Sequence, residues 1–87
     1  MRHQKPKAGK QLRARRLQLG LSLRDVHRAS LQISKRLHNR KFAIPASRLH
    51  YFETRNSAPG AYRFYALAKI YGCTMAELFA LYGIPWR

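Results

Sequence analysis

Acidic side chains are scarce in this chain. Three Asp and Glu stand against 18 Lys and Arg, so 87 residues carry a formal net charge of +15. So large an excess of one sign repels itself and weakens a compact state unless a polyanion is the working partner. Nucleic acid is therefore the first candidate partner, an anionic membrane surface is the second, and a merely soluble basic domain is the third interpretation.

Cysteine pairs, long apolar runs and metal-ligand clusters are missing as well. Cys73 stands alone, which excludes an internal disulfide and fits a reducing, cytosolic setting. No run of about 18 apolar residues occurs, and no apolar segment follows the basic first residues, so we expect neither a membrane span nor a signal peptide. The four histidines are scattered and the cysteine has no partner at a zinc-binding spacing, so we expect no metal and no cofactor.

The apolar residues that are present, 46% of the chain, follow a helical spacing and suffice for one small core. We expect an all-α domain of five helices: residues 10–19, 22–38, 45–54 and 61–71, and a last helix that opens at Thr74. Residues 1–9 are expected to form a flexible basic arm, residues 10–83 the domain and residues 84–87 a tail. The positions expected to follow the core-facing pattern are Leu12, Leu19, Val26, Ser30, Ile33, Leu37, Leu49, Phe52, Phe64, Leu67, Ala68, Tyr71, Met75, Leu78 and Phe79.

Two of the three acidic residues have a structural explanation. Ser22 with Asp25, and Thr74 with Glu77, have the spacing of a capping box, in which two side chains satisfy free amides at the start of a helix. Neither acid then needs a catalytic role. Because no second carboxylate is left for acid–base or metal chemistry, we expect no catalytic residues and no enzyme.

Three stretches, RLQLGLSLRDV (residues 16–26), SRLHYFETRNSAP (residues 47–59) and LAKIYGCTMAELF (residues 67–79), resemble the repressor/Cro-type helix-turn-helix family. The resemblance covers roughly residues 8–83. It implies five short helices, of which the third, at about residues 45–54, lies in the major groove of DNA. It also implies a sequence-specific regulator of transcription that binds double-stranded DNA, located in the bacterial cytoplasm on the nucleoid, with no small-molecule ligand evident.

The family resemblance also gives the third acidic residue a role. An arginine of the first helix commonly pairs there with a glutamate near the end of the third, and Arg16 and Glu53 match those positions. A carboxylate that faces a core is strongly disfavoured unless it is paired and hydrogen-bonded, and a guanidinium does both. We therefore expect a buried structural ion pair in preference to an exposed, solvated Glu53.

The sequence departs from the family pattern at two places. Where the family usually has a left-handed glycine after the third helix, this chain has Arg55, followed by Asn56. Either Arg55 takes that backbone or the turn shifts by one residue to Asn56, which tolerates it better. The connection between the second and third helices is also about a dozen residues longer than usual. This insertion, within residues 31–44, either extends the second helix or forms an inserted loop.

The resemblance places the start of the helix at 45–54 against DNA. Arg48 is the main candidate for a base contact, because its fork pairs two acceptors on one guanine edge. Ser47 can meet a base or a phosphate, Ala46 can pack on a thymine methyl group, and Tyr51 lies next along the same face. The expected phosphate contacts are Leu23, Arg24, Lys35, Arg36, Arg40, Lys41, Thr54, Arg55 and Asn56. The basic arm could lie in a minor groove through Arg2, Lys5, Lys7 and Lys10.

Other functions stay open at this stage. A protein that binds RNA or coats the nucleoid by charge alone would suit the basic insertion, and an antitoxin-like module would use a groove to hold a protein partner. Members of the family usually act as dimers, so a homodimer on DNA is a further expectation. The apolar tail at residues 82–86 could serve as a dimer contact or lead into a longer chain. Membrane binding is the weakest alternative, because no helix pairs a broad apolar face with a basic one.

Overall fold

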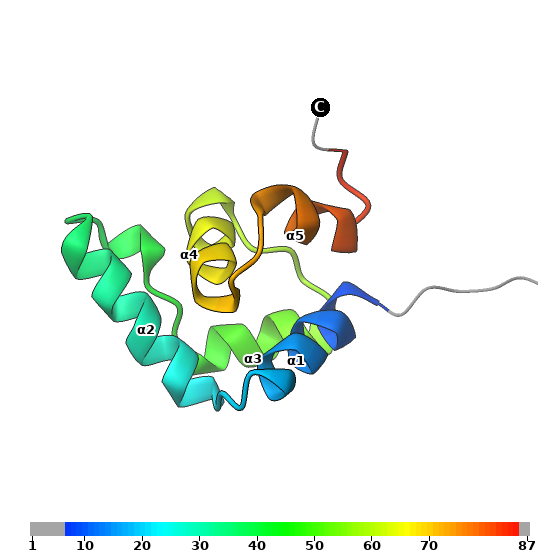
Figure 1. Cartoon of the computed structure of the whole chain (residues 1–87), viewed down its shortest axis with the longest axis horizontal. Helices are drawn as coiled ribbons and strands as arrows, with labels where there is room; N and C mark the ends of the chain where they lie inside the picture. Colours follow the sequence, from blue (N-terminus) through cyan, green and yellow to red (C-terminus); the bar gives the residue numbers. More distant parts are fainter. Residues whose placement is uncertain (1–6, 86–87) are drawn as a thin grey trace, which may run out of the picture.

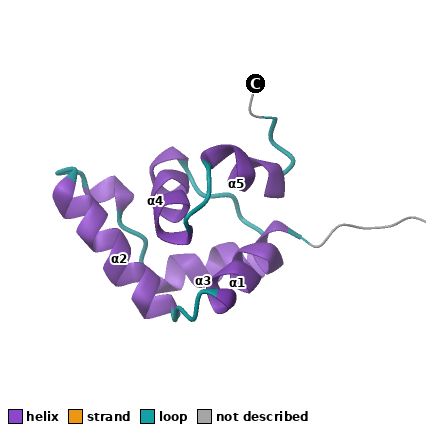
Figure 2. Cartoon of the chain, viewed as in Figure 1, coloured by secondary structure: helices purple, strands orange, loops and turns teal. Residues whose placement is uncertain are grey.

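The computed structural model describes residues 7–85, and within that range the chain is helical with no strand. Its helices are α1 (Ala8–Gln18), α2 (Leu23–Arg36), α3 (Ala46–Arg55), α4 (Ala61–Tyr71) and α5 (Met75–Leu81), with a short 3-10 turn, η1 (Arg40–Phe42), between α2 and α3. Figure 2 shows the five α-helices and the loops that join them. The all-α prediction is therefore confirmed, and the expected helix boundaries hold to within about two residues.

The helices enclose one core. α1 and α3 lie side by side, and α2 contacts α3 and extends away from it (Figure 1). α4 packs against α2, and α5 packs against α4. The turn η1 contacts both α2 and α4, so the segment before α3 is folded back onto the domain. The radius of gyration is 12.8 Å, as expected for a compact chain of this length.

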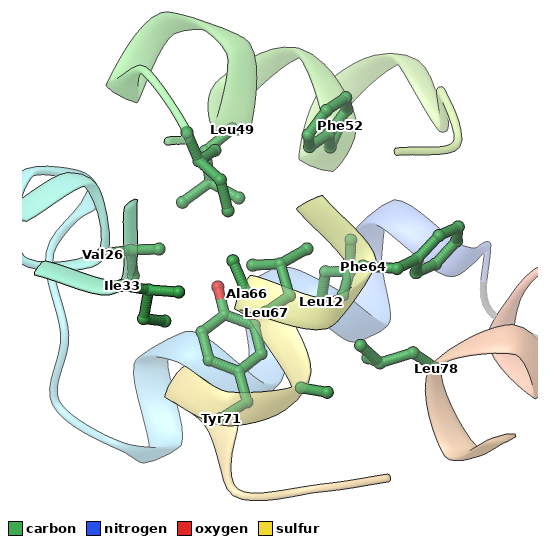
Figure 3. Close-up of a cluster of buried hydrophobic side chains, with 12 residues drawn as sticks. Leu12, Val26, Ile33, Leu49, Phe52, Phe64, Ala66, Leu67, Tyr71 and Leu78 are labelled. Carbon is green, nitrogen blue, oxygen red and sulfur yellow. The ribbon is translucent and has the colours of Figure 1, made fainter. Parts of the chain in front are cut away.

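Most of the predicted core positions are buried, and side chains from all five α-helices meet in this core (Figure 3). The prediction is wrong for Leu19 and Leu37, which are 47% and 44% exposed. Both residues are C-caps, directly after α1 and α2, so the chain turns away from the core before their side chains can follow the helical stripe. Met75 and Phe79 are only partly buried.

Both predicted capping boxes are present. The Ser22 hydroxyl accepts from the backbone N–H of Asp25 at 3.0 Å, and the Asp25 carboxylate accepts from the N–H of Ser22 at 2.8 Å. Thr74 and Glu77 repeat this arrangement at 3.0 and 2.8 Å. The backbone hydrogen bonds lower the pKa of both carboxyl groups below their ordinary values, because they favour the charged form.

The insertion is part helix and part loop, so both alternatives that the sequence left open occur. α2 continues to Arg36, and the chain then passes through the left-handed His38 (φ 53°) into η1. The return segment is fastened to α2 through Ile44: its N–H donates to the Ser30 hydroxyl at 2.8 Å, and its carbonyl accepts from Nδ1 of His27 at 2.9 Å. The Ile44 side chain is completely buried.

Within residues 7–85 no single helix has the length and hydropathy to cross a membrane. α4 and α5 meet that criterion only when they are taken together, and they are bent by 110° relative to each other.

Candidate nucleic-acid interface

α3 has one face in the core and one face in solvent. Leu49 and Phe52 are buried against the neighbouring helices, as expected from their spacing. On the opposite side Ser47, Arg48 and Tyr51 are exposed and border a shallow hollow of about 350 Å³. Polar and aromatic side chains are thus displayed along a helix whose other side is anchored.

The structure brings Arg16 of α1 and Glu53 of α3 together as a buried bidentate pair. Nε of Arg16 donates to Oε2 of Glu53 at 2.7 Å, and Nη2 donates to Oε1 at 2.9 Å. Nη1 of Arg16 also donates to the carbonyl of Leu21 at 3.0 Å. The hydrogen bonds that Arg16 donates to Glu53 raise the pKa of Arg16 above its usual value, although burial acts in the opposite direction. This pair fixes the angle of α3 against α1.

The end of α3 resolves the choice between Arg55 and Asn56. Arg55 is the last helical residue, and Asn56 takes the left-handed conformation with φ 57° and ψ 25°. The Asn56 side chain then reaches across to α1, where its Oδ1 accepts from the N–H of Gly9 at 2.8 Å. Asn56 was an expected phosphate contact, and its side-chain oxygen is therefore used within the fold.

Gly9 is a residue whose role the sequence did not reveal. It belongs to α1 together with the buried Ala8, although both were expected in the basic arm. A Cβ at this position would lie 2.6 Å from the carbonyl oxygen of Phe52 and closer still to that of Glu53. Only a glycine allows α1 and α3 to approach so closely. A buried glycine in a helix has no distinctive local pattern, so no signal in the sequence pointed to it.

The remaining predicted DNA contacts fall into four places. Ala46 is half-buried at the start of α3, while Thr54 and Arg55 are exposed at its end, and the Thr54 hydroxyl donates to the His50 carbonyl at 2.8 Å. Leu23 is half-buried and Arg24 exposed in the first turn of α2. Lys35, Arg36, Arg40 and Lys41 are exposed at the end of α2 and in η1. Of the expected arm residues, Lys7 and Lys10 are exposed beside and in α1, and Arg2 and Lys5 lie outside the described residues.

Cationic side chains on α3 and η1 have no carboxylate partner. In the described part of the chain Asp25 and Glu77 serve the capping boxes and Glu53 is buried with Arg16. The one other ion pair there joins Arg28 to Asp25 at 3.8 Å, in the first turns of α2. Above the exposed Tyr51 ring lie the guanidinium carbons of Arg48 and Arg55, 6.0 and 4.9 Å from its centroid. The outer face of α3 therefore presents basic and aromatic side chains together with the polar Ser47 and Thr54.

A second group of aromatic and basic residues lies on η1 and the outer side of α4, and of its members the sequence pointed only to Lys41. Phe42 packs edge-on against Tyr62 and Tyr65, with centroid distances of 5.1 and 5.4 Å. Lys41 lies 5.2 Å from the centroid of the Tyr62 ring, and Lys69 lies 5.6 Å from that of Tyr65. The spacing of residues 62, 65 and 69 is itself a helical stripe, but it adjoins the stronger core stripe of the same helix and was not distinguished from it.

In residues 7–85 no three His, Cys, Asp or Glu side chains come together in a way that could hold a metal ion. Comparisons with protein-family models, with curated proteins and with solved structures matched none of them to this chain.

Proposed function

We propose that this protein is a sequence-specific regulator of transcription that binds double-stranded DNA as a repressor/Cro-type helix-turn-helix domain, with α3 in the major groove. The observation that carries the proposal is the two-faced α3. Its inner face is held by Leu49, Phe52 and the Arg16–Glu53 pair, and its outer face presents exposed basic and polar side chains. A rigidly mounted helix with such a face is suited to reading base edges.

Arg48 is the main residue for base recognition in this proposal. It is exposed in the first turn of α3, next to Ser47, and no carboxylate in the described part of the chain pairs with it. A guanidinium in that position can donate two parallel hydrogen bonds to O6 and N7 of a guanine. Ser47, Ala46 and Tyr51 complete the reading face.

Phosphate contacts position the helix. Arg24 lies at the start of α2, and Thr54 and Arg55 lie at the end of α3, so the two sites flank the reading face. Lys35, Arg36, Arg40 and Lys41 extend the basic surface along the far end of α2. Such contacts supply affinity without sequence information.

The test is selection of bound sequences from a random pool of duplexes, followed by binding of the selected duplex and a scrambled one. We expect a consensus, and we expect Arg48→Ala to reduce the preference for it by about 1–3 kcal/mol. Arg13→Ala, on the exposed side of α1, is the matched control and should leave the preference unchanged. Selection without a consensus would refute base readout, and an equal loss on both duplexes would make Arg48 a phosphate contact. A consensus with two-fold symmetry would show that two copies bind together.

A further inference from the structure

The aromatic and basic side chains on η1 and α4 form a continuous ladder: Lys41, Tyr62, Phe42, Tyr65 and Lys69. Each member contacts the next, and a lysine stands at each end. The ladder runs along a different side of α4 from the core residues Phe64, Leu67 and Tyr71. Phe42 and Tyr65 also pack against the core, whereas Tyr62 and Lys69 are exposed. Phe42 is half-buried between the two tyrosines, and Tyr62 is 42% exposed.

A hollow lies beside the exposed tyrosine. It measures about 250 Å³ and is lined by Lys41, Gly60, Tyr62 and Arg63. Nε of Arg63 donates to the carbonyl of Ala43 at 2.9 Å, which holds the guanidinium at the rim. An aromatic ring and two cations therefore meet in one depression, and none of the described carboxylates forms an ion pair there.

The ladder has more than a structural role. Phe42, through its contacts with both tyrosines, and the hydrogen bond from Arg63 to Ala43 fasten η1 to α4, and the Ile44 hydrogen bonds fasten the same segment to α2. Anchoring does not require an exposed Tyr62 ring or a lysine at each end of the ladder. An exposed ring among cations, at the edge of a hollow, is instead the arrangement on which unpaired bases stack while their phosphates meet the cations.

A nucleic-acid duplex would contact the cations of this surface but not its exposed aromatic ring. Its bases are stacked on one another, so a duplex offers phosphates to Lys41 and Arg63 but no open base face to Tyr62. A single strand offers both. An acidic peptide would satisfy the cations but, like a duplex, has no need of the ring.

We propose that η1 and the outer side of α4 form a binding surface for single-stranded nucleic acid, separate from the duplex-reading face of α3. A base stacks on Tyr62 at the hollow, and Lys41, Arg63 and Lys69 bind the flanking phosphates. The inference rests on the proposed function only in taking nucleic acid as the partner of this chain. It adds a second ligand and a second site.

The test uses the full chain and labelled single strands of thymidine or of uridine, with a selected duplex as the comparison. Tyr62→Leu should lower the affinity for the single strand by roughly tenfold, because it removes the stacking face while keeping an apolar side chain. Its affinity and preference for the duplex should not change. Tyr62→Phe, which keeps the ring, should bind the single strand as well as the original protein does.

Tyr51→Leu is the matched control. Tyr51 is 44% exposed and lies under cations, as Tyr62 does, but it belongs to α3. It should leave single-strand binding intact. The thymidine and uridine strands show whether DNA or RNA is the preferred source of the unpaired bases.

Two results would overturn the inference: an unchanged single-strand affinity in a folded Tyr62→Leu protein, or an equal loss of single-strand affinity in Tyr62→Leu and Tyr51→Leu. If circular dichroism shows that Tyr62→Leu has lost its fold, Lys69→Gln replaces it, since that side chain is exposed and is not among the proposed duplex contacts. Failure of duplex selection together with a selective Tyr62 effect would remove the proposed function and leave this inference standing.

Discussion

The position of the Glu53 carboxylate explains how α3 is oriented in this basic protein. In a chain with 18 basic residues, an acid beside the reading face would repel phosphate if it pointed outward. It points inward, where Arg16 satisfies both of its oxygens. A buried pair of this kind contributes little over an apolar one, but losing one partner leaves the other charge buried and uncompensated. Its value here is the defined orientation of α3.

The first prediction concerns this pair. Glu53→Gln should reduce the free energy of unfolding by about 3 kcal/mol, because the buried Arg16 guanidinium loses its counter-charge. Urea denaturation monitored by circular dichroism measures the change. The double replacement Arg16→Met and Glu53→Leu should recover a large part of the loss, since no charge is then left buried. An unchanged stability in Glu53→Gln would show that the carboxylate is solvated.

The second prediction concerns the buried hydroxyl group of Tyr71. Its ring is buried with the hydroxyl pointing into the cluster (Figure 3), and that hydroxyl has no hydrogen-bond partner in the described part of the chain. Desolvation raises its pKa above the usual value, because the charged form is disfavoured there. Tyr71→Phe removes an unsatisfied polar group at nearly constant shape, so the free energy of unfolding should rise by about 1 kcal/mol. A decrease, measured by the same denaturation, would point to a hydrogen-bond partner for the hydroxyl.

Among the helices, the contact between α1 and α3 determines where the proposed reading face of α3 points. The backbones approach closely at Gly9, whose N–H also receives the Asn56 side chain from the end of α3. The ion pair holds the same two helices further along α1. Two separate contacts therefore prevent α3 from rolling about its axis.

The third prediction tests that contact. Gly9→Ala should lower the free energy of unfolding by about 1–3 kcal/mol, because the added methyl group would collide with backbone atoms of Phe52 and Glu53 that cannot move independently. Gly60→Ala is the control: Gly60 has φ −79°, and a Cβ there meets no atom within 4 Å. Equal melting temperatures for the two variants would contradict the close approach.

At the scale of the whole molecule, charge is the dominant property. The chain carries +15, and the acids of its described part are all engaged in caps or in the buried pair, so the excess positive charge is displayed on the surface. This charge suits the proposed nucleic-acid partner, because a polyanion is attracted over a distance before any specific contact forms.

The fourth prediction follows from this charge. If six to eight cations replace counterions on duplex DNA, the logarithm of the affinity should fall with the logarithm of the salt concentration at a slope of roughly −5 to −7. Titrations of the selected duplex at several salt concentrations give the slope. Replacing Arg24 by Gln should reduce its magnitude by about one, whereas Arg13→Gln should leave it unchanged. A slope near −1 would contradict the broad basic interface.

The sequence by itself determined the properties that depend on local spacing and composition. The charge excess is a count over the composition. The helices, their capping boxes and the core stripes of α3 and α4 follow from neighbours a few residues apart, and each was predicted. Arg16 and Glu53 were paired through the family resemblance, and the structure brings them together.

Tertiary structure decided whatever depends on two distant segments meeting. Gly9 matters only because α3 passes beside it, Ile44 is buried only because Ser30 and His27 hold its backbone, and Leu37 is exposed because the chain turns after α2. The ladder of Lys41, Tyr62, Phe42, Tyr65 and Lys69 likewise needs η1 to fold onto α4. Local patterns specify which residues form a helix, but contacts between residues far apart in the chain are made only when the elements pack.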